Sequence, residues 1–170
     1  QVPGALWQTS VATTERHSVV NAIAAPSTRW ITLTVTEKGY TPALAQLLID
    51  GLRLRHAAGH AGLTIASCDN LQGNGHKLQV LIHATATAQD AALMEWMDTH
   101  CAFPCSMVDR IVPAATDEVA TAAKDALGLI DDCALSTETF WEWVIEDNFA
   151  DPADAALLAK CGVRVTPDVH

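Results

Sequence analysis

The residues best suited to chemistry lie where an apolar stretch, residues 63–67, runs into a loop rich in polar residues and glycine. Asp69, Asn70 and Asn74 stand in this loop, with Gly73 and Gly75 beside them. Ligands of α/β proteins bind at the carboxyl ends of strands, and an amide side chain can both donate and accept hydrogen bonds. The stretch therefore indicates a ligand site centred on Asn70. The alternative is an ordinary strand-to-helix connection, because Asn, Asp and Gly are also the usual turn residues.

Two further stretches end in charged residues. Residues 29–36 are rich in β-branched and aromatic side chains, which predicts a strand that runs into Glu37 and Lys38. The apolar stretch 103–113 is interrupted by Asp109 and Arg110. Charges within an apolar run cost free energy unless they are paired or hydrogen-bonded. The pair is therefore either a local ion pair at a strand edge or part of a functional site.

The elements that must position these residues alternate between strands and helices. Thr41 and Pro42 have the types preferred at the N-cap and first turn of a helix, which Gly59 and Gly62 would end. Further helices are predicted at about 19–25, 76–88, 90–101, 116–128 and 151–162. One or two strands are predicted within 133–146 and a last strand at 163–165. This alternation predicts an α/β fold with a largely parallel sheet and flanking helices.

Composition excludes several classes of function. The chain has 170 residues with 20 acidic and 10 basic side chains, a net charge of -10, which argues against a nucleic-acid surface. No apolar run reaches the length of a membrane span, and nothing resembles a signal peptide. Five cysteines, an odd number without regular spacing, favour reduced thiols and a cytoplasmic location.

Metal ligands are not evident in the sequence. Cys101 and Cys105 stand four positions apart, but no second pair completes a four-ligand set, and the seven histidines follow no metal-binding pattern. His83 and His100 fit packed or exposed single residues better than ligands. We therefore expect no bound metal.

Four motifs occur in order along the chain: TVTEKGY at 34–40, SCDNLQGNG at 67–75, MVDRIVP at 107–113 and WVIED at 143–147. Together they resemble the polyol-specific long-chain dehydrogenases and reductases, which include mannitol 2-dehydrogenase and fructuronate reductase (D-mannonate oxidoreductase). The similarity covers roughly residues 29–147 and continues more weakly to the C-terminus. The short segment after Tyr40 favours the fructuronate reductase side.

The resemblance implies that residues 1–170 are a single domain, the C-terminal part of the family's Rossmann-like NAD-binding domain. The family's glycine-rich turn and its C-terminal catalytic helix, with Lys, Asn and His, have no counterpart in this sequence. The chain also begins without Met. We therefore expect an excerpt of a longer chain, with the remainder of that chain as its partner.

The function implied by the resemblance is metal-independent hydride transfer between NAD, or NADP, and a sugar alcohol or sugar acid. The substrate pairs would be mannitol and fructose, or mannonate and fructuronate. Asn70 would donate to the reacting oxygen, and Glu37 would be the carboxylate at the proton exit of the family's catalytic lysine. Asp109 would shape the site or contact substrate.

Three more residues follow from the same resemblance. Arg110 would contact substrate and could grip the carboxylate of an anionic one. Asn74 would be a further substrate neighbour and Lys38 a neighbour of the cofactor, distinct from the family's catalytic lysine.

Two other functions stay open on the sequence. The first is a non-catalytic Rossmann-like binding or interaction module. The second is a metal-dependent hydrolase that uses Asp69, Asp109 and a histidine, which is disfavoured because no histidine stands at ligand spacing from either carboxylate.

Overall fold

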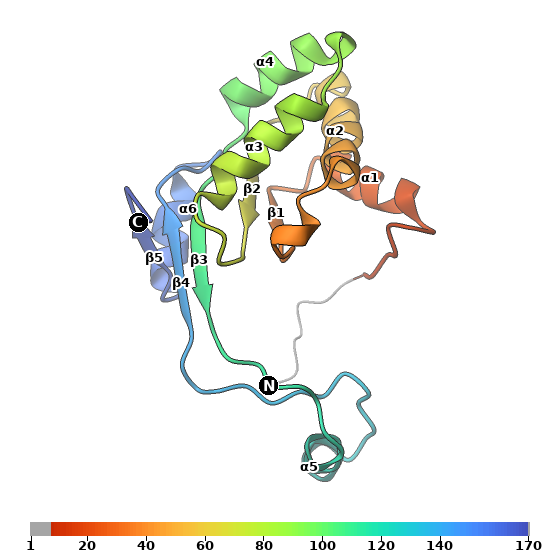
Figure 1. Ribbon diagram of the computed structural model, residues 1–170, viewed down its shortest axis with the longest axis vertical. Coiled ribbons are helices and arrows are strands. Elements are labelled where there is room, and N and C mark those ends of the chain that lie inside the picture. The colour runs from red at the N-terminus through yellow and green to blue at the C-terminus, as the bar shows by residue number, and fades with distance from the viewer. Residues whose placement is uncertain (1–7, 170) are drawn as a thin grey trace.

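The computed structural model describes residues 8–169, which form an α/β fold of six helices and five strands (Figure 1). The α-helices are α1 Arg16–Ala24, α2 Pro42–Ala57, α3 Asn74–Thr85, α4 Ala91–His100, α5 Asp117–Leu127 and α6 Ala153–Lys160. Two short 3-10 turns are η1 Glu37–Gly39 and η2 Ala88–Asp90. The strands are β1 Trp30–Leu33, β2 Thr64–Ser67, β3 Ser106–Asp109, β4 Glu142–Glu146 and β5 Arg164–Thr166.

The strands form two short sheets that the chain between α4 and β3 connects. β1 and β2 pair in parallel, with Trp30 opposite Thr64. Just before β3, Ala102 forms a parallel bridge with Thr64, so this segment extends the β1–β2 sheet. β3 then pairs antiparallel with β4, and β4 pairs in parallel with β5.

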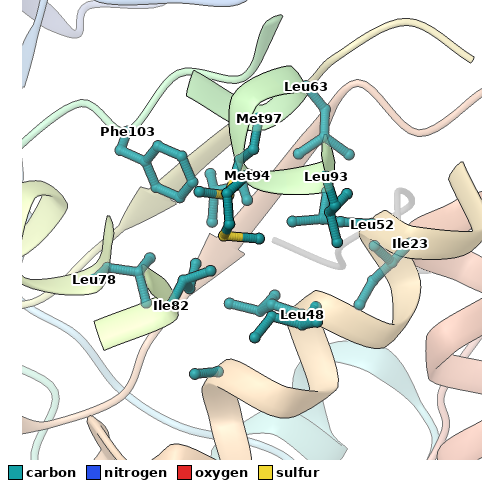
Figure 2. Packing of buried hydrophobic residues seen from close by; sticks show 13 residues of the cluster. Ile23, Leu48, Leu52, Leu63, Leu78, Ile82, Leu93, Met94, Met97 and Phe103 are labelled. Atoms are coloured by element: carbon teal, nitrogen blue, oxygen red, sulfur yellow. The ribbon is translucent and has the colours of Figure 1, made fainter. Parts of the chain in front are cut away.

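The main hydrophobic core lies between the helices α1 to α4 and the strands β1 and β2 (Figure 2). Leu48 and Leu52 of α2, Leu78 and Ile82 of α3 and Met97 of α4 are almost fully buried there. Their near-helical spacing in the sequence places them on one face of each helix. Burying a side chain of this size contributes about 1.5–3 kcal/mol, so this core fixes the helices that flank the site.

The segment 110–141 projects from this body, with α5 at its far end (Figure 1). Within the described residues, α5 has no buried side chain, although Thr116 caps it through the backbone N–H of Val119. Large apolar side chains are exposed along the segment: Ile111, Val112, Leu127, Leu129, Ile130, Leu135 and Phe140.

The predicted α/β class is confirmed, and most predicted helices lie within a few residues of their observed bounds. Thr41 caps α2 as expected, accepting from the backbone N–H of Leu44. The region 133–146 contains one strand, β4, within the one or two predicted. The sheet is less parallel than predicted, because β3 runs antiparallel to β4. Among the described residues, no helix is long and apolar enough to cross a membrane.

Candidate active site

Asn70 lies at the carboxyl end of β2, between two hollows that share Cys68, Asn70 and Val108 in their walls. One hollow, of about 400 Å³, is also lined by the residues that follow β1, including Glu37. The other, of about 420 Å³, is also lined by Asp109. Asn70 is exposed, and its amide has no hydrogen-bond partner among residues 8–169. Its donors and acceptor are therefore available to a ligand.

The neighbouring carboxylate of Asp69 holds this loop in place. One carboxylate oxygen accepts from the Tyr40 hydroxyl at 2.8 Å and from the Ser67 hydroxyl at 2.9 Å. The other accepts from the backbone N–H of Leu71 at 3.0 Å and the amide of Asn74 at 3.2 Å. A carboxylate with four hydrogen bonds is committed to the protein, so Asp69 positions Asn70 and does not act as a base.

Tyr40 connects the end of β1 to the end of β2. Its hydroxyl lies 2.6 Å from the Ser67 hydroxyl and donates to Asp69. Burial, reinforced by the bond to Asp69, raises the pKa of the Tyr40 phenol well above its ordinary value. The phenol therefore stays neutral over the physiological pH range and keeps donating its hydrogen bond to Asp69, so the two strand ends remain joined.

Asn74 was predicted to lie beside the substrate, but the structure gives it a structural role. It is fully buried, and its amide nitrogen donates to the carbonyls of Ser67 and Ser106 at 3.0 and 2.8 Å. Its amide oxygen accepts from the backbone N–H of Ser106 and of Gly75, each at 2.9 Å. With donors and acceptor occupied inside the protein, Asn74 has no hydrogen bond left for a substrate. We propose that it clamps β2, β3 and α3 together.

The position that follows Asn74 requires a glycine, Gly75. A Cβ atom at this position would lie 2.4 Å from the carbonyl oxygen of Phe103 and 2.6 Å from that of Pro104. Only glycine allows the first turn of α3 to approach this segment so closely. The loop that presents Asn70 is thus braced against the chain that enters β3.

The residues expected beside the cofactor lie in the 3-10 turn η1. Glu37 is exposed and lines the hollow that it shares with Asn70, so the structure brings these two predicted residues together. Lys38 stands in the same turn and is also exposed, but it lines neither hollow around Asn70. Its assignment to the cofactor remains a prediction.

A local ion pair between Asp109 and Arg110, one of the two alternatives left open by the sequence, is absent among residues 8–169. Asp109 ends β3 with an exposed carboxylate, and both residues line the second hollow. The Arg110 guanidinium instead donates to the backbone carbonyl of Glu138 at 3.1 and 3.3 Å.

Cys68 is the one thiol that lines both hollows. Burial raises the pKa of its thiol, so at neutral pH it is protonated and a poor nucleophile. A hydrolase site built on Asp69 and Asp109 is not supported either, because Asp69 is committed to the loop. The groups left for chemistry are the free amide of Asn70 and the exposed carboxylates of Glu37 and Asp109. The amide can stabilise a developing oxyanion, and the carboxylates can orient hydroxyls by accepting hydrogen bonds from them.

The supporting residues Tyr40, Ser67 and Ser106 are not evident as site residues from the sequence alone. The Ser106 hydroxyl donates to the carbonyl of Ser67 at 2.6 Å, beside the Asn74 clamp. Position within the motifs was the available signal, because Tyr40 closes TVTEKGY, Ser67 opens SCDN and Ser106 directly precedes MVDRIVP. Their long-range partners are not visible in local sequence.

The fold and the site define a Rossmann-type α/β domain whose polar loops gather at the carboxyl ends of parallel strands. The chain belongs to the mannitol dehydrogenase Rossmann domain family, whose profile matches residues 6–155.

Named relatives agree with this assignment. The chain is 40% identical over 160 aligned positions to D-mannonate oxidoreductase of Escherichia coli, covering 79% of this chain and 33% of that protein. It is 37% identical over 180 positions to mannitol 2-dehydrogenase of Cereibacter sphaeroides, covering 92% of this chain and 37% of that protein.

A solved structure gives the same result. The ternary complex of Pseudomonas fluorescens mannitol 2-dehydrogenase with NAD and D-mannitol superposes with a TM-score of 0.84 at 30% identity. The match covers 98% of this chain and 38% of that one. The chain therefore spans about a third of the length of the relatives that it matches.

Proposed function

We propose that the protein carrying this chain is an NAD- or NADP-dependent oxidoreductase that interconverts a sugar alcohol or aldonate and its keto form. Family membership and relatives named for mannitol and D-mannonate support the substrate class. The structural neighbour solved with NAD and D-mannitol supports a nicotinamide cofactor. The cofactor, when bound, accepts or returns the hydride of the carbinol carbon.

The free amide of Asn70 is the observation that carries this proposal. It stands at the carboxyl end of β2, and the hollow beside it is also lined by the residues that follow β1. Ligands of doubly wound sheets bind at such strand ends, so the residues present fit the reacting end of a cofactor and substrate. An amide N–H stabilises an oxygen that gains negative charge in the transition state and needs no proton transfer of its own.

The carboxylates around Asn70 have separate proposed roles. Glu37 lines the hollow on one side of Asn70, where we place the exit for the proton that leaves the substrate hydroxyl. Asp109 lines the hollow on the other side, where it can accept hydrogen bonds from substrate hydroxyls. Neither step requires a metal ion, so hydride transfer is proposed to be metal-independent. Lys38 is proposed to lie beside the cofactor.

The domain assignment is also a proposal. We propose that this chain is one domain, the later part of the NAD-binding domain, and that the rest of the protein supplies the glycine-rich turn and the catalytic lysine. The length of the relatives supports this, as do the apolar side chains exposed along 110–141. Cytoplasm is proposed as the location from the cysteine pattern alone.

An anionic substrate, mannonate or fructuronate, is the finer proposal. Arg110 lines the hollow with Asp109, and its donors to Glu138 leave other guanidinium N–H groups free for a carboxylate. In the full-length protein, Arg110→Met should raise KM for fructuronate at least about tenfold and change KM for fructose little. Arg16→Met, which removes an exposed guanidinium lining neither hollow, is the control. Equal losses on both substrates would assign Arg110 to structure alone.

The proposed activity is tested by assaying the full-length protein for oxidation of mannonate, mannitol and sorbitol with NAD and with NADP. We expect cofactor reduction with at least one of these substrates and retained activity after treatment with a chelator. Inactivity with every polyol and aldonate, by a folded protein, would contradict the proposal and favour a binding module.

A further inference from the structure

Three potential metal ligands meet on the far side of the loop that presents Asn70. His76 comes from the first turn of α3, Cys105 directly precedes β3, and Glu146 ends β4. One ligand atom from each residue lies within 4.8 Å of the other two. The Sγ atom of Cys105 and the Nδ1 atom of His76 are 3.6 Å apart. None of the three lines either hollow around Asn70.

This ligand set and its spacing suit zinc. Thiolate, imidazole and carboxylate are the three ligand types that zinc binds, with bonds of about 2.3 Å to sulfur and about 2.0–2.1 Å to nitrogen. At a tetrahedral angle, these bonds place sulfur and nitrogen about 3.6 Å apart, which is the separation observed between Cys105 and His76. Three protein ligands leave the fourth position for water.

We propose that His76, Cys105 and Glu146 bind a zinc ion that ties α3, β3 and β4 together. This site is separate from the proposed chemistry at Asn70, so its role is to brace the fold behind the site. From the sequence, Cys101 and Cys105 were expected to be unliganded and no bound metal was expected. In the structure Cys105 faces His76 and Glu146, from 29 positions before it and 41 after it.

The surroundings of each ligand agree with this proposal. Backbone N–H groups of Gly75 and His76 point at the Cys105 sulfur, where they favour its thiolate. The carboxylate of Glu146 accepts from the backbone N–H of Cys105 at 2.7 Å, which holds it beside the sulfur.

The exposure of the ligands also fits metal entry. Cys105 is 3% exposed and fixed by its neighbours, whereas His76 is exposed and Glu146 is half-buried. A cation can therefore reach the sulfur from the solvent side, and small rotations of the imidazole and carboxylate can complete the coordination.

Cobalt(II) is the spectroscopic probe for this site, because it takes zinc's place and absorbs in the near-ultraviolet when a thiolate binds it. The metal-free full-length protein is titrated with Co²⁺, and thermal unfolding is followed with and without Zn²⁺. We expect one equivalent of Co²⁺ with thiolate absorption, and a higher melting temperature with Zn²⁺. In Cys105→Ser and in His76→Gln, affinity should fall at least about 100-fold.

Cys161→Ser is the matched control, because Cys161 is an exposed free thiol outside the cluster. It should bind Co²⁺ as the wild type does. Because His76 is exposed, His76→Gln should fold normally and separates loss of a ligand from loss of the fold. Absence of thiolate absorption in the wild type, or equal binding by His76→Gln and wild type, would overturn the proposal.

Discussion

Two asparagines four positions apart show how environment decides the role of a residue. Asn70 is exposed, and its amide has no partner among the described residues, whereas Asn74 is fully buried with donors and acceptor occupied. Both lie in the SCDNLQGNG motif, and the amide side chain of each is of a type that can bind a ligand. Only Asn70 has hydrogen bonds to offer a substrate.

The Tyr40 hydroxyl should stabilise the loop that presents Asn70. Tyr40→Phe removes the bonds to Ser67 and Asp69 and leaves the ring in place. We expect the free energy of unfolding to fall by about 1–2 kcal/mol, because a partly buried carboxylate oxygen loses a donor. Urea unfolding measures this change, and kcat should fall less than it does on loss of the Asn70 amide. Unchanged stability would show that the hydroxyl does not hold the loop.

At the scale of one residue, the sequence located the site better than it assigned roles. Asn70 shares one hollow with Glu37 and a second hollow with Asp109, and the roles given to these three residues stay predictions. The ion pair between Asp109 and Arg110 did not form, because Arg110 finds the carbonyl of Glu138, 28 positions away. Such a partner depends on tertiary structure, so adjacent residues could not reveal it.

At the scale of elements, local signals predicted helices more precisely than sheet topology. Thr41 and Pro42 marked the start of α2 because capping and the fixed φ of proline are local effects. The antiparallel pairing of β3 with β4 depends instead on the long segment 110–141 that joins them. Neither strand carries a local signal for its direction, so a largely parallel sheet was expected throughout.

The stability contributed by the turn before α4 should depend on pH in the acid range. Asp90 is 3% exposed and accepts from the backbone N–H and hydroxyl of Thr87 and from the guanidinium of Arg53. The backbone bond from Thr87, followed by Arg53, lowers the pKa of Asp90 from 3.8 to about 2. When folding lowers the pKa of a carboxyl, that carboxyl stabilises the folded state at pH values above its unfolded-state pKa. This stabilisation is lost as the pH falls through the folded-state pKa.

Asp90→Asn should therefore lower the free energy of unfolding at pH 7 by about 1–2 kcal/mol. The difference from wild type should shrink as pH falls from 3.8 to about 2, where wild-type Asp90 is itself protonated. Chemical unfolding at pH 7 and at pH values from 3.8 down to about 2 measures the stability difference and its decrease. Asp125→Asn, at an exposed carboxyl of α5 with no partner among the described residues, is the control. A difference that does not vary with pH would contradict the role given to the Asp90 charge.

At the scale of the whole molecule, the chain presents part of a site on a complete core. The core of α1 to α4 is closed, whereas the segment 110–141 exposes apolar side chains to solvent. The relatives are about three times as long as the matched stretch. Residues 1–170 contain no G-x-G-x-x-G sequence, and we propose that the lysine-bearing helix of the family lies in the rest of the protein.

The 170-residue chain alone should therefore bind NAD weakly and oxidise no polyol. Without the phosphate-binding turn and the catalytic base, the loss in rate should be several orders of magnitude. Calorimetry with NAD and an assay with mannitol and mannonate test this, with the full-length protein as the positive control. Turnover of either substrate by the isolated chain would show that the groups for catalysis all lie within it.

Replacement of Asn70 in the full-length enzyme tests the central claim most directly, with kcat and melting temperature measured on the same preparation. We predict that Asn70→Ala lowers kcat by about 10²–10³, equivalent to roughly 3–4 kcal/mol of transition-state stabilisation, and leaves NAD binding and melting temperature nearly unchanged. Asn70→Asp should be at least as damaging, because it puts a negative charge beside the growing one. Asn74→Ala, the matched control, should lower the melting temperature. The claim would be contradicted if Asn70→Ala lost melting temperature while kcat per folded molecule stayed within a few-fold of wild type.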